Sequence, residues 1–158
     1  MKHGGIMSEA IIIFTKSNTD PLSWLIRWAL PMSRFKWARA SHSMILDGDY
    51  VIHATMRHGG VIRQPLAEAL KNQQVVTTRV FQVDNLENGI DWAKKQIGKS
   101  YDFKGAFGIA LTPDREWIED DSWFCHELCA AFLHNSGKKL FREFGHVTDS
   151  ALLLVNPS

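Results

Sequence analysis

Cys125 is the residue whose type and position in this chain are best suited to covalent chemistry. It belongs to a segment, Ser122–Gly137, in which apolar residues recur at helical spacing: Phe124, Leu128, Ala131 and Phe132. Ser122 or Asp121 is a suitable N-cap and Gly137 a suitable C′ residue, so the pattern predicts one helix with Cys125 in its first turn. Unpaired N–H groups and the helix dipole stabilise a thiolate at that position, which prepares a cysteine as a nucleophile.

A buried cysteine without a chemical role is the alternative, because free cysteine is among the most buried residue types. We apply that interpretation to Cys129, which follows one turn later among apolar neighbours. Cys125 differs from it because of its place at the start of the predicted helix, and because a pair of histidines precedes it in the chain.

His42 and His53 lie in two strand-like runs that flank Asp47-Gly48, and Asp-Gly is the strongest short signal for a β-hairpin. A turn at Asp47-Gly48 predicts the pairs Leu46 with Asp49, Met44 with Val51 and His42 with His53. A turn at Gly48-Asp49 would also leave both histidines on one face. Two imidazoles within cross-strand reach are suited to serve a cysteine nucleophile as base and orienting partner. A metal site formed by the two histidines and Cys125 is the competing interpretation, although no carboxylate at a matching position completes it.

The composition is that of one globular domain. The chain has 158 residues, of which 45% are hydrophobic and 22% charged, so it can bury a real core. The net charge of +1 gives no argument for a nucleic-acid partner, and we expect none. Cys125 and Cys129 do not form a disulfide framework, and their spacing matches no common zinc motif, so we expect neither metal nor cofactor.

No apolar run reaches the length of a transmembrane helix, and the chain start lacks a signal-peptide segment, so the expected location is cytoplasmic. We expect residues 1–10 to form a flexible leader, with Met7 as an alternative start of translation, and residues 11–158 to form one domain. Basic and aromatic side chains are interleaved in residues 24–39, a segment that could contact a membrane surface. A core helix with a solvated basic face is the more common explanation of such a segment.

The remaining segments complete an α+β domain. Strands are expected at 11–15, 61–63 and 74–83, a helical turn at 65–70, an amphipathic helix at 85–97 with Leu86, Ile90, Ala93 and Ile97 inward, and a turn and strand at 147–155. Residues 105–121 read as a loop-rich insertion before the cysteine helix, and the sequence does not determine whether it closes the site.

This order of features resembles the circularly permuted branch of the NlpC-type papain-like superfamily. That group includes cell-wall peptidases and amidases, and its permuted members are similar to lecithin–retinol acyltransferase. The resemblance covers residues 11–155 and depends on four short motifs: Ser41-His42-Ser43, Val51-Ile52-His53-Ala54, Gly98-x-x-Tyr101-Asp102 and Cys125-x-Glu127-Leu128. In the permuted branch the histidine precedes the cysteine, as it does here. The resemblance implies a papain-like fold, with an antiparallel sheet packed on a nucleophile-bearing helix.

The resemblance also implies roles for individual residues. Cys125 matches the nucleophile and His42 the general base. His53 matches the third polar residue, which orients the base and is often Glu in permuted members. Tyr101 matches a tyrosine near the active site that would help to hold substrate or oxyanion. His126 stands where family members often have Ser, and there it would contact the substrate.

Together these features predict a cysteine-dependent hydrolase that cleaves an amide bond, for example in a cell-wall peptide, through an acyl-enzyme on Cys125. One alternative is a lipid-directed acyltransferase or thioesterase of the same fold, and the other is a papain-like domain that binds without catalysis. The expected partner is a peptide or an acyl substrate. The sequence determines neither the acyl acceptor, nor the oligomeric state, nor a chemical role for Glu127.

Overall fold

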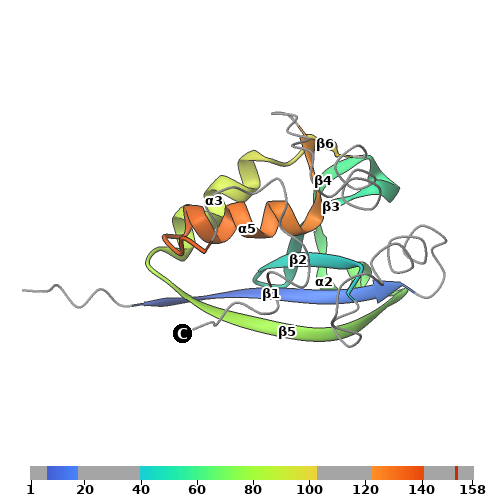
Figure 1. The fold of residues 1–158 in the computed structure, drawn as a ribbon. Helices are drawn as coiled ribbons and strands as arrows, with labels where there is room; N and C mark the ends of the chain where they lie inside the picture. Colours follow the sequence, from blue (N-terminus) through green and yellow to red (C-terminus); the bar gives the residue numbers. More distant parts are fainter. Residues whose placement is uncertain (1–6, 18–39, 103–121, 141–151, 153–158) are drawn as a thin grey trace, which may run out of the picture.

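In the part of the chain that the structure describes, a seven-stranded sheet is the central element (Figure 1). The computed structural model describes residues 7–17, 40–102, 122–140 and 152. In chain order the strands are β1 (Ser8–Ser17), β2 (His42–Asp47), β3 (Tyr50–Thr55), β4 (Gly60–Pro65), β5 (Gln73–Val83), β6 (Ser100–Tyr101) and β7 (Ser122–Trp123). Their order across the sheet is β5-β1-β2-β3-β4-β6-β7, and neighbours are antiparallel except for the parallel pair β6 and β7.

Helices cover both faces of this sheet. The described helices are α2 (Leu66–Ala69), α3 (Leu86–Lys95) and α5 (Cys125–Asn135), with a short 3-10 helix, η1 (Met56–His58). α3 and α5 lie together above the sheet in Figure 1, and α5 packs against β2 and β3. Among the described helices, none is long and apolar enough to cross a membrane.

Alternation along the strands divides the apolar side chains between two clusters. The larger one lies between the sheet and the helices α3 and α5. Its largest fully buried members are Ile12, Phe14, Ile45, Ile52, Phe81, Leu128, Phe132, Leu133 and Leu152. The smaller one, Ile13, Met44, Val51 and Ala69, is extended by Leu66 and Leu70 at α2. Adjacent residues such as Phe14 and Ile13 therefore belong to opposite faces.

The α+β class predicted from the sequence is confirmed, and most local predictions agree with the structure. The strands expected at 11–15, 61–63 and 74–83 are present as β1, β4 and β5, and the helical turn expected at 65–70 as α2. β1 already begins at Ser8, and Ala10 is fully buried. The strand is therefore longer than the predicted 11–15, and it includes residues 8–10, which were assigned to the expected leader.

The hairpin between β2 and β3 forms, but its turn is shifted by one residue. Asp47 pairs with Tyr50, so the turn residues are Gly48 and Asp49, and the pairs predicted for a turn at Asp47-Gly48 are wrong. Gly48 has a φ of 63°, whereas no residue other than glycine has a positive φ in the described chain. This arrangement suits a type II′ turn, which needs a positive φ only at its first central residue.

The cysteine helix ends as predicted but begins later. Gly137 follows the helix with a φ of 93°, and the N–H of Lys138 donates to the carbonyl of Leu133 at 2.9 Å, which closes the last turn. Ser122 is not the N-cap; it pairs with Ser100 in the parallel strands β6 and β7, and Phe124 occupies the cap position. Strand pairing has overridden the local capping preference of serine.

The amphipathic helix expected at 85–97 is α3, and it is shorter than the prediction. Asn85 caps it by accepting the N–H of Asn88 at 3.0 Å. Ile97 was expected to face inward, but it lies beyond the helix and is 42% exposed. Gln96 is buried instead and accepts a hydrogen bond from the indole N–H of Trp123 at 3.2 Å. Residues 24–39, 105–121 and 147–155 lie outside the described residues, apart from Leu152, which is helical and buried.

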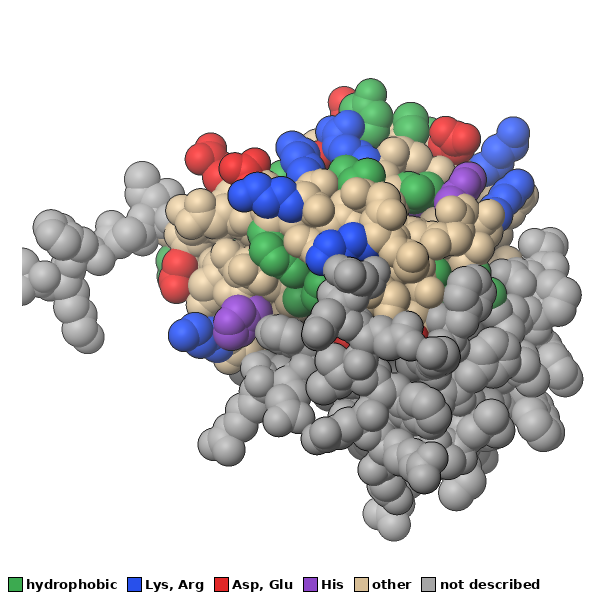
Figure 2. Space-filling view, turned by 90° about the horizontal axis from the view of Figure 1, so that it is seen from above, with side chains coloured by type: hydrophobic (Ala, Val, Ile, Leu, Met, Phe, Trp, Pro, Cys, Tyr) green, Lys and Arg blue, Asp and Glu red, His purple; other side chains and the backbone are tan. Residues whose placement is uncertain are grey.

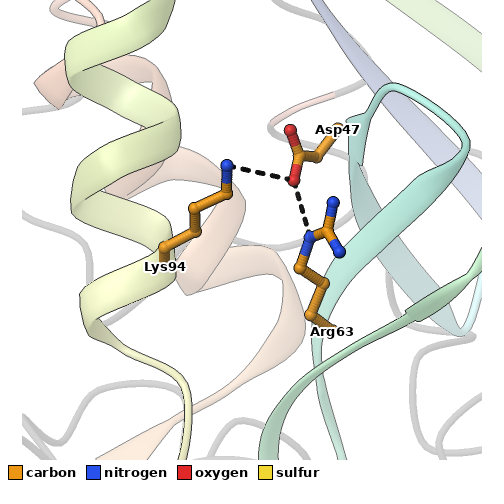
Figure 3. Close-up of polar contacts among 3 residues, drawn as sticks. All are labelled: Asp47, Arg63 and Lys94. Carbon is orange, nitrogen blue, oxygen red and sulfur yellow. Dashed lines mark hydrogen bonds and ion pairs between the residues drawn. The ribbon is translucent and has the colours of Figure 1, made fainter.

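A small charged cluster connects α3 with the outer end of the hairpin (Figure 3). Asp47 accepts a hydrogen bond from Arg63 Nε at 2.7 Å and lies 3.5 Å from Lys94 Nζ. The guanidinium of Arg63 also stacks 3.8 Å over the ring of Tyr50. Seen from above, the described part of the molecule carries Lys and Arg interspersed with Asp and Glu rather than a field of one sign (Figure 2). Partly exposed ion pairs of this kind contribute little to stability, so their main effect is on orientation.

Candidate active site

Cys125 is the first residue of α5. Phe124, in extended conformation (φ −90°, ψ 150°), precedes it as the N-cap, and the thiol-bearing residue is only 1% exposed. The backbone N–H of Phe124 donates to Glu127 Oε2 at 3.4 Å, so Glu127 ties the cap to the first turn. The prediction that Cys125 lies in the first turn of a helix is therefore confirmed, and the helix dipole acts on its thiol.

His42 and His53 form a hydrogen-bonded pair. His42 Nε2 lies 2.7 Å from His53 Nδ1, and the two rings meet edge to face with centroids 4.9 Å apart. His42 is the first residue of β2 and His53 lies in β3, but the pairing of these strands ends at Ile45 and Ile52. The contact therefore joins the two strands where their backbone ladder has ended.

A second polar contact connects the histidine pair with the start of α5. His126 Nδ1 lies 2.8 Å from Ser43 Oγ, and Cys129 Sγ donates to the same oxygen at 3.3 Å. The residue after His42 is thus bonded to the residue after Cys125. Adjacent residues of a strand point to opposite faces of the sheet. Ser43 points toward α5, so His42 lies on the other face of β2, together with His53 of β3.

Burial keeps the three imidazoles neutral. It lowers the pKa of His42 from 6.5 to about 3, and a positive charge on His126 would lower it further. Burial likewise lowers the pKa of His53 to about 2, with further contributions from His42 and His58, and that of His126 to about 3. Near neutral pH each of the three rings therefore has one nitrogen that can accept a proton.

The thiol of Cys129 is a buried side chain of the core. It is fully buried, and burial raises the pKa of this thiol well above its ordinary value, an effect that the hydrogen bond to Ser43 opposes in part. A thiol in this environment stays protonated and inert, as expected for a cysteine that acts as a small apolar side chain.

The side-chain carboxyl group of Glu127 has a raised pKa. Burial raises its pKa from 4.5 to about 7; the hydrogen bond from Phe124 opposes this, and the neighbouring Asp102 adds to it. Near neutral pH this carboxyl group is therefore protonated in part, which reduces the negative charge next to Cys125. The sequence assigned Glu127 no role, and the structure shows it as the group that holds the helix cap.

The two residues predicted to contact substrate are both buried. His126 is 3% exposed and packs between the rings of Phe14 and Phe124, with centroids 6.4 Å and 5.2 Å away. Tyr101 is 7% exposed, meets the ring of Phe124 edge to face, and donates its backbone N–H to Gly59. Their roles toward a substrate stay predictions.

Two residues of the site were missing from the sequence interpretation. Ser43 connects β2 with α5, and Gln64 lies with its amide nitrogen 2.9 Å from His53 Nε2. Ser43 stood inside the Ser-His-Ser motif, so its position beside His42 was a usable signal. For Gln64, the alternation of residues 60–65 is not enough to predict the contact with His53, because that contact depends on the register between β3 and β4.

Among the described residues, no group of three or more His, Cys, Asp or Glu side chains is arranged to hold a metal ion.

Ser43→Ala should lower the free energy of unfolding by about 2 kcal/mol, because it leaves the buried His126 nitrogen and the Cys129 thiol without their shared partner. Urea unfolding monitored by circular dichroism measures the change. Ser100→Ala, at an exposed serine, is the matched control and should change stability by less than about 0.5 kcal/mol. Equal effects of the two substitutions would show that the Ser43 contact does not stabilise the fold.

Comparison of the chain with protein-family models, with curated proteins and with solved structures finds no match. The functional interpretation therefore depends on the geometry of the site and on the motif resemblance.

Proposed function

We propose that this protein is a cysteine-dependent hydrolase of the permuted NlpC-type papain-like fold, which cleaves an amide bond through an acyl-enzyme on Cys125. The observation that carries the proposal is the 2.7 Å hydrogen bond between His42 Nε2 and His53 Nδ1, because the His42 tautomer that donates from Nε2 has a bare Nδ1 that can take a thiol proton. The contact between Ser43 and His126 supports it, since it brings the start of β2 to the start of α5.

The proposed reaction assigns one step to each group. His42 takes the proton of the Cys125 thiol, and the sulfur attacks the carbonyl carbon of the substrate. The backbone N–H of Cys125, at the positive end of α5, stabilises the oxyanion. Collapse of this intermediate breaks the C–N bond, and the leaving amine receives the proton from His42. Water then attacks the thioester, with His42 as the base, and releases the acid and the free thiol.

The substrate of this proposal is an amide such as a cell-wall peptide. An amine or alcohol in place of water would make the same site an acyltransferase. Alternation along β2 directs Ser43 toward α5 and His42 toward the opposite face. Because His42 is the first residue of β2, the proposed contact between the Cys125 thiol and His42 passes the end of this strand.

A binding domain without catalysis is the second candidate, and one observation favours it. Cys125 is 1% exposed and His53 5% exposed, so a substrate has no direct access to either side chain in this conformation. A domain that only binds would keep the fold and would leave this thiol with ordinary reactivity.

The pH dependence of thiol alkylation tests the proposal. At pH 6, Cys125 should react with iodoacetamide at least tenfold faster in the native protein than in His42→Ala, because an ordinary thiol of pKa about 8.5 is almost wholly protonated there. Peptide mass spectrometry separates Cys125 from Cys129. Asn72→Ala, at an exposed residue outside the histidine pair, is the control and should react like the native chain.

Two results decide between the candidates. Fast labelling at low pH that disappears in His42→Ala supports the cysteine–histidine couple, in which neutral His42 accepts the thiol proton as the sulfur reacts. It justifies a screen of peptide and lipid acyl donors. Slow labelling with an ordinary pH profile in both proteins, under conditions where urea-unfolded protein labels fully, contradicts the hydrolase and leaves the binding domain.

A further inference from the structure

Gln64 extends the histidine pair into a chain of three side chains. It lies in β4 directly opposite Val51 of β3, and alternation places it on the same face as His53. Its amide nitrogen is 2.9 Å from His53 Nε2, while His53 Nδ1 is 2.7 Å from His42 Nε2. One hydrogen-bonded chain therefore crosses the three adjacent strands β2, β3 and β4.

The number of protons in this chain restricts its arrangements to two. Burial lowers the pKa of both His42 and His53 far below 7, so each neutral ring carries one N–H. In the first arrangement His42 Nε2–H donates to His53 Nδ1; His42 Nδ1 is then an acceptor, and His53 Nε2–H needs an acceptor of its own. In the second, His53 Nδ1–H donates to His42 Nε2; His42 then carries its proton on Nδ1, and His53 Nε2 needs a donor.

The amide of Gln64 can satisfy either arrangement. Its nitrogen only donates and its oxygen only accepts, and a half-turn about the last side-chain bond exchanges them. The amide nitrogen faces His53 in the structure, which corresponds to the second arrangement. In that state His42 Nδ1 already carries a proton and cannot take one from a thiol, so the native protein reacts through the smaller share of molecules in the first arrangement. The half-turn produces the first arrangement and makes His42 Nδ1 a base.

We infer that Gln64 is a positioning residue whose amide orientation determines which ring nitrogen of His42 carries the proton. The catalytic consequence of this inference depends on the function proposed above, whereas the control of the tautomer does not. Gln64 would thereby act on Cys125 through two imidazoles, without touching either the thiol or the substrate.

Substitutions at Gln64 should select between the arrangements. In Gln64→Glu the carboxylate can only accept, so it favours His53 Nε2–H and a bare His42 Nδ1. The labelling of Cys125 at pH 6 should then be about tenfold faster than in the native protein. Gln64→Leu keeps the approximate volume but offers neither donor nor acceptor, and labelling should be unchanged or slower. Gln74→Glu, which adds the same charge at an exposed position of β5, should react like the native protein.

Nitrogen-15 NMR of the imidazole rings reads the tautomers directly, because protonated and bare ring nitrogens have well-separated chemical shifts. The native protein should show His42 protonated mainly at Nδ1, with the form protonated at Nε2 as the minor species that serves Cys125, and Gln64→Glu should make the Nε2-protonated form the major one. The His42→Ala and His53→Ala variants assign the signals. A merely structural role of Gln64 would change the stability without moving the proton.

The outcomes separate this inference from the proposed function. Identical tautomers in the native protein, Gln64→Glu and Gln64→Leu overturn the inference, whatever the labelling shows. If Gln64→Glu fails to fold, the comparison of the native protein with Gln64→Leu still decides the matter. A proton that moves as expected, while labelling of Cys125 responds to neither Gln64 nor His42, supports the inference and contradicts the hydrolase.

Discussion

Lowering the pH from 7 to 5 should reduce the free energy of unfolding by about 4 kcal/mol. Burial lowers the pKa of His42, His53 and His126 from 6.5 to about 3, 2 and 3. Below pH 6.5 these three histidines therefore bind protons in the unfolded chain, whereas they stay neutral in the folded protein until the pH approaches the folded pKa. Each of these histidines contributes its full stabilisation above pH 6.5 and loses it as the pH falls toward the folded pKa. At pH 5 the loss is about 2 kcal/mol per histidine, provided that the folded pKa lies well below 5.

Glu127 acts in the opposite direction. Its pKa is raised from 4.5 to about 7, so between these values the folded protein binds the extra proton and gains stability as the pH falls. The gain between pH 7 and 5 is about 2 kcal/mol, which offsets one of the three histidines. The net effect therefore remains a loss of about 4 kcal/mol.

Urea unfolding at pH 7, 6 and 5 measures this dependence. His126→Asn should remove about 2 kcal/mol of the loss, and Glu127→Gln should increase the loss by about 2 kcal/mol, because it removes the opposing titration. Asn72→Ala, at an exposed residue that does not titrate, should leave the slope unchanged. Stability that is constant or rises toward pH 5 in the native protein would show that the buried imidazoles are charged in the folded state.

The sequence predicted the elements whose signals are local. The β-branched run that forms β1, the Asp-Gly signal of the hairpin and the glycine after α5 each act within a few residues. All three elements are present in the structure, although the hairpin turn is shifted by one residue. The errors have tertiary causes. Ser122 pairs with Ser100 instead of capping α5, and Gln96 is buried against Trp123 where Ile97 was expected to face inward.

The same distinction applies to the candidate site. The contact between His42 and His53 was predictable because one hairpin of known alternation carries both. Ser43 and His126 are 83 residues apart, so their contact depends on how α5 docks on the sheet. The contact of Gln64 depends on the register of β4 against β3, which the pattern of the two strands leaves undetermined.

His126 and Glu127, the two residues that follow Cys125, do not carry a full charge near neutral pH. Burial keeps His126 neutral, and it raises the pKa of Glu127 to about 7. A charge on either would act directly on a thiolate at the start of α5, with opposite signs. In the proposed function the reactivity of Cys125 would therefore depend mainly on the helix dipole and on His42, which is the reason that substitution of His42 is a sharp test.

Gly60→Ala should lower the free energy of unfolding by about 3 kcal/mol. A Cβ at this position would lie well inside van der Waals contact of the Lys99 carbonyl oxygen, which is backbone and cannot rotate away. That oxygen accepts the N–H of Val61 at 2.9 Å, and Gly60 itself pairs with Ser100. Relief of the clash requires β4 and β6 to separate, and the hydrogen bonds between them would be lost.

Gly59→Ala is the matched control at the adjacent residue. Gly59 has a φ of 71° with open space around its position, so alanine there adds only the strain of a left-handed backbone, about 1 kcal/mol. Urea unfolding of the two variants separates crowding from strain.

The larger effect of Gly60→Ala should extend to the site. β6 is the parallel partner of β7, and Phe124 alone separates β7 from Cys125. A shift of β6 therefore displaces the start of α5, and the labelling of Cys125 at pH 6 should change in Gly60→Ala but not in Gly59→Ala. Equal destabilisation by the two substitutions, with unchanged labelling in both, would show that the pairing of β4 with β6 does not position the cysteine.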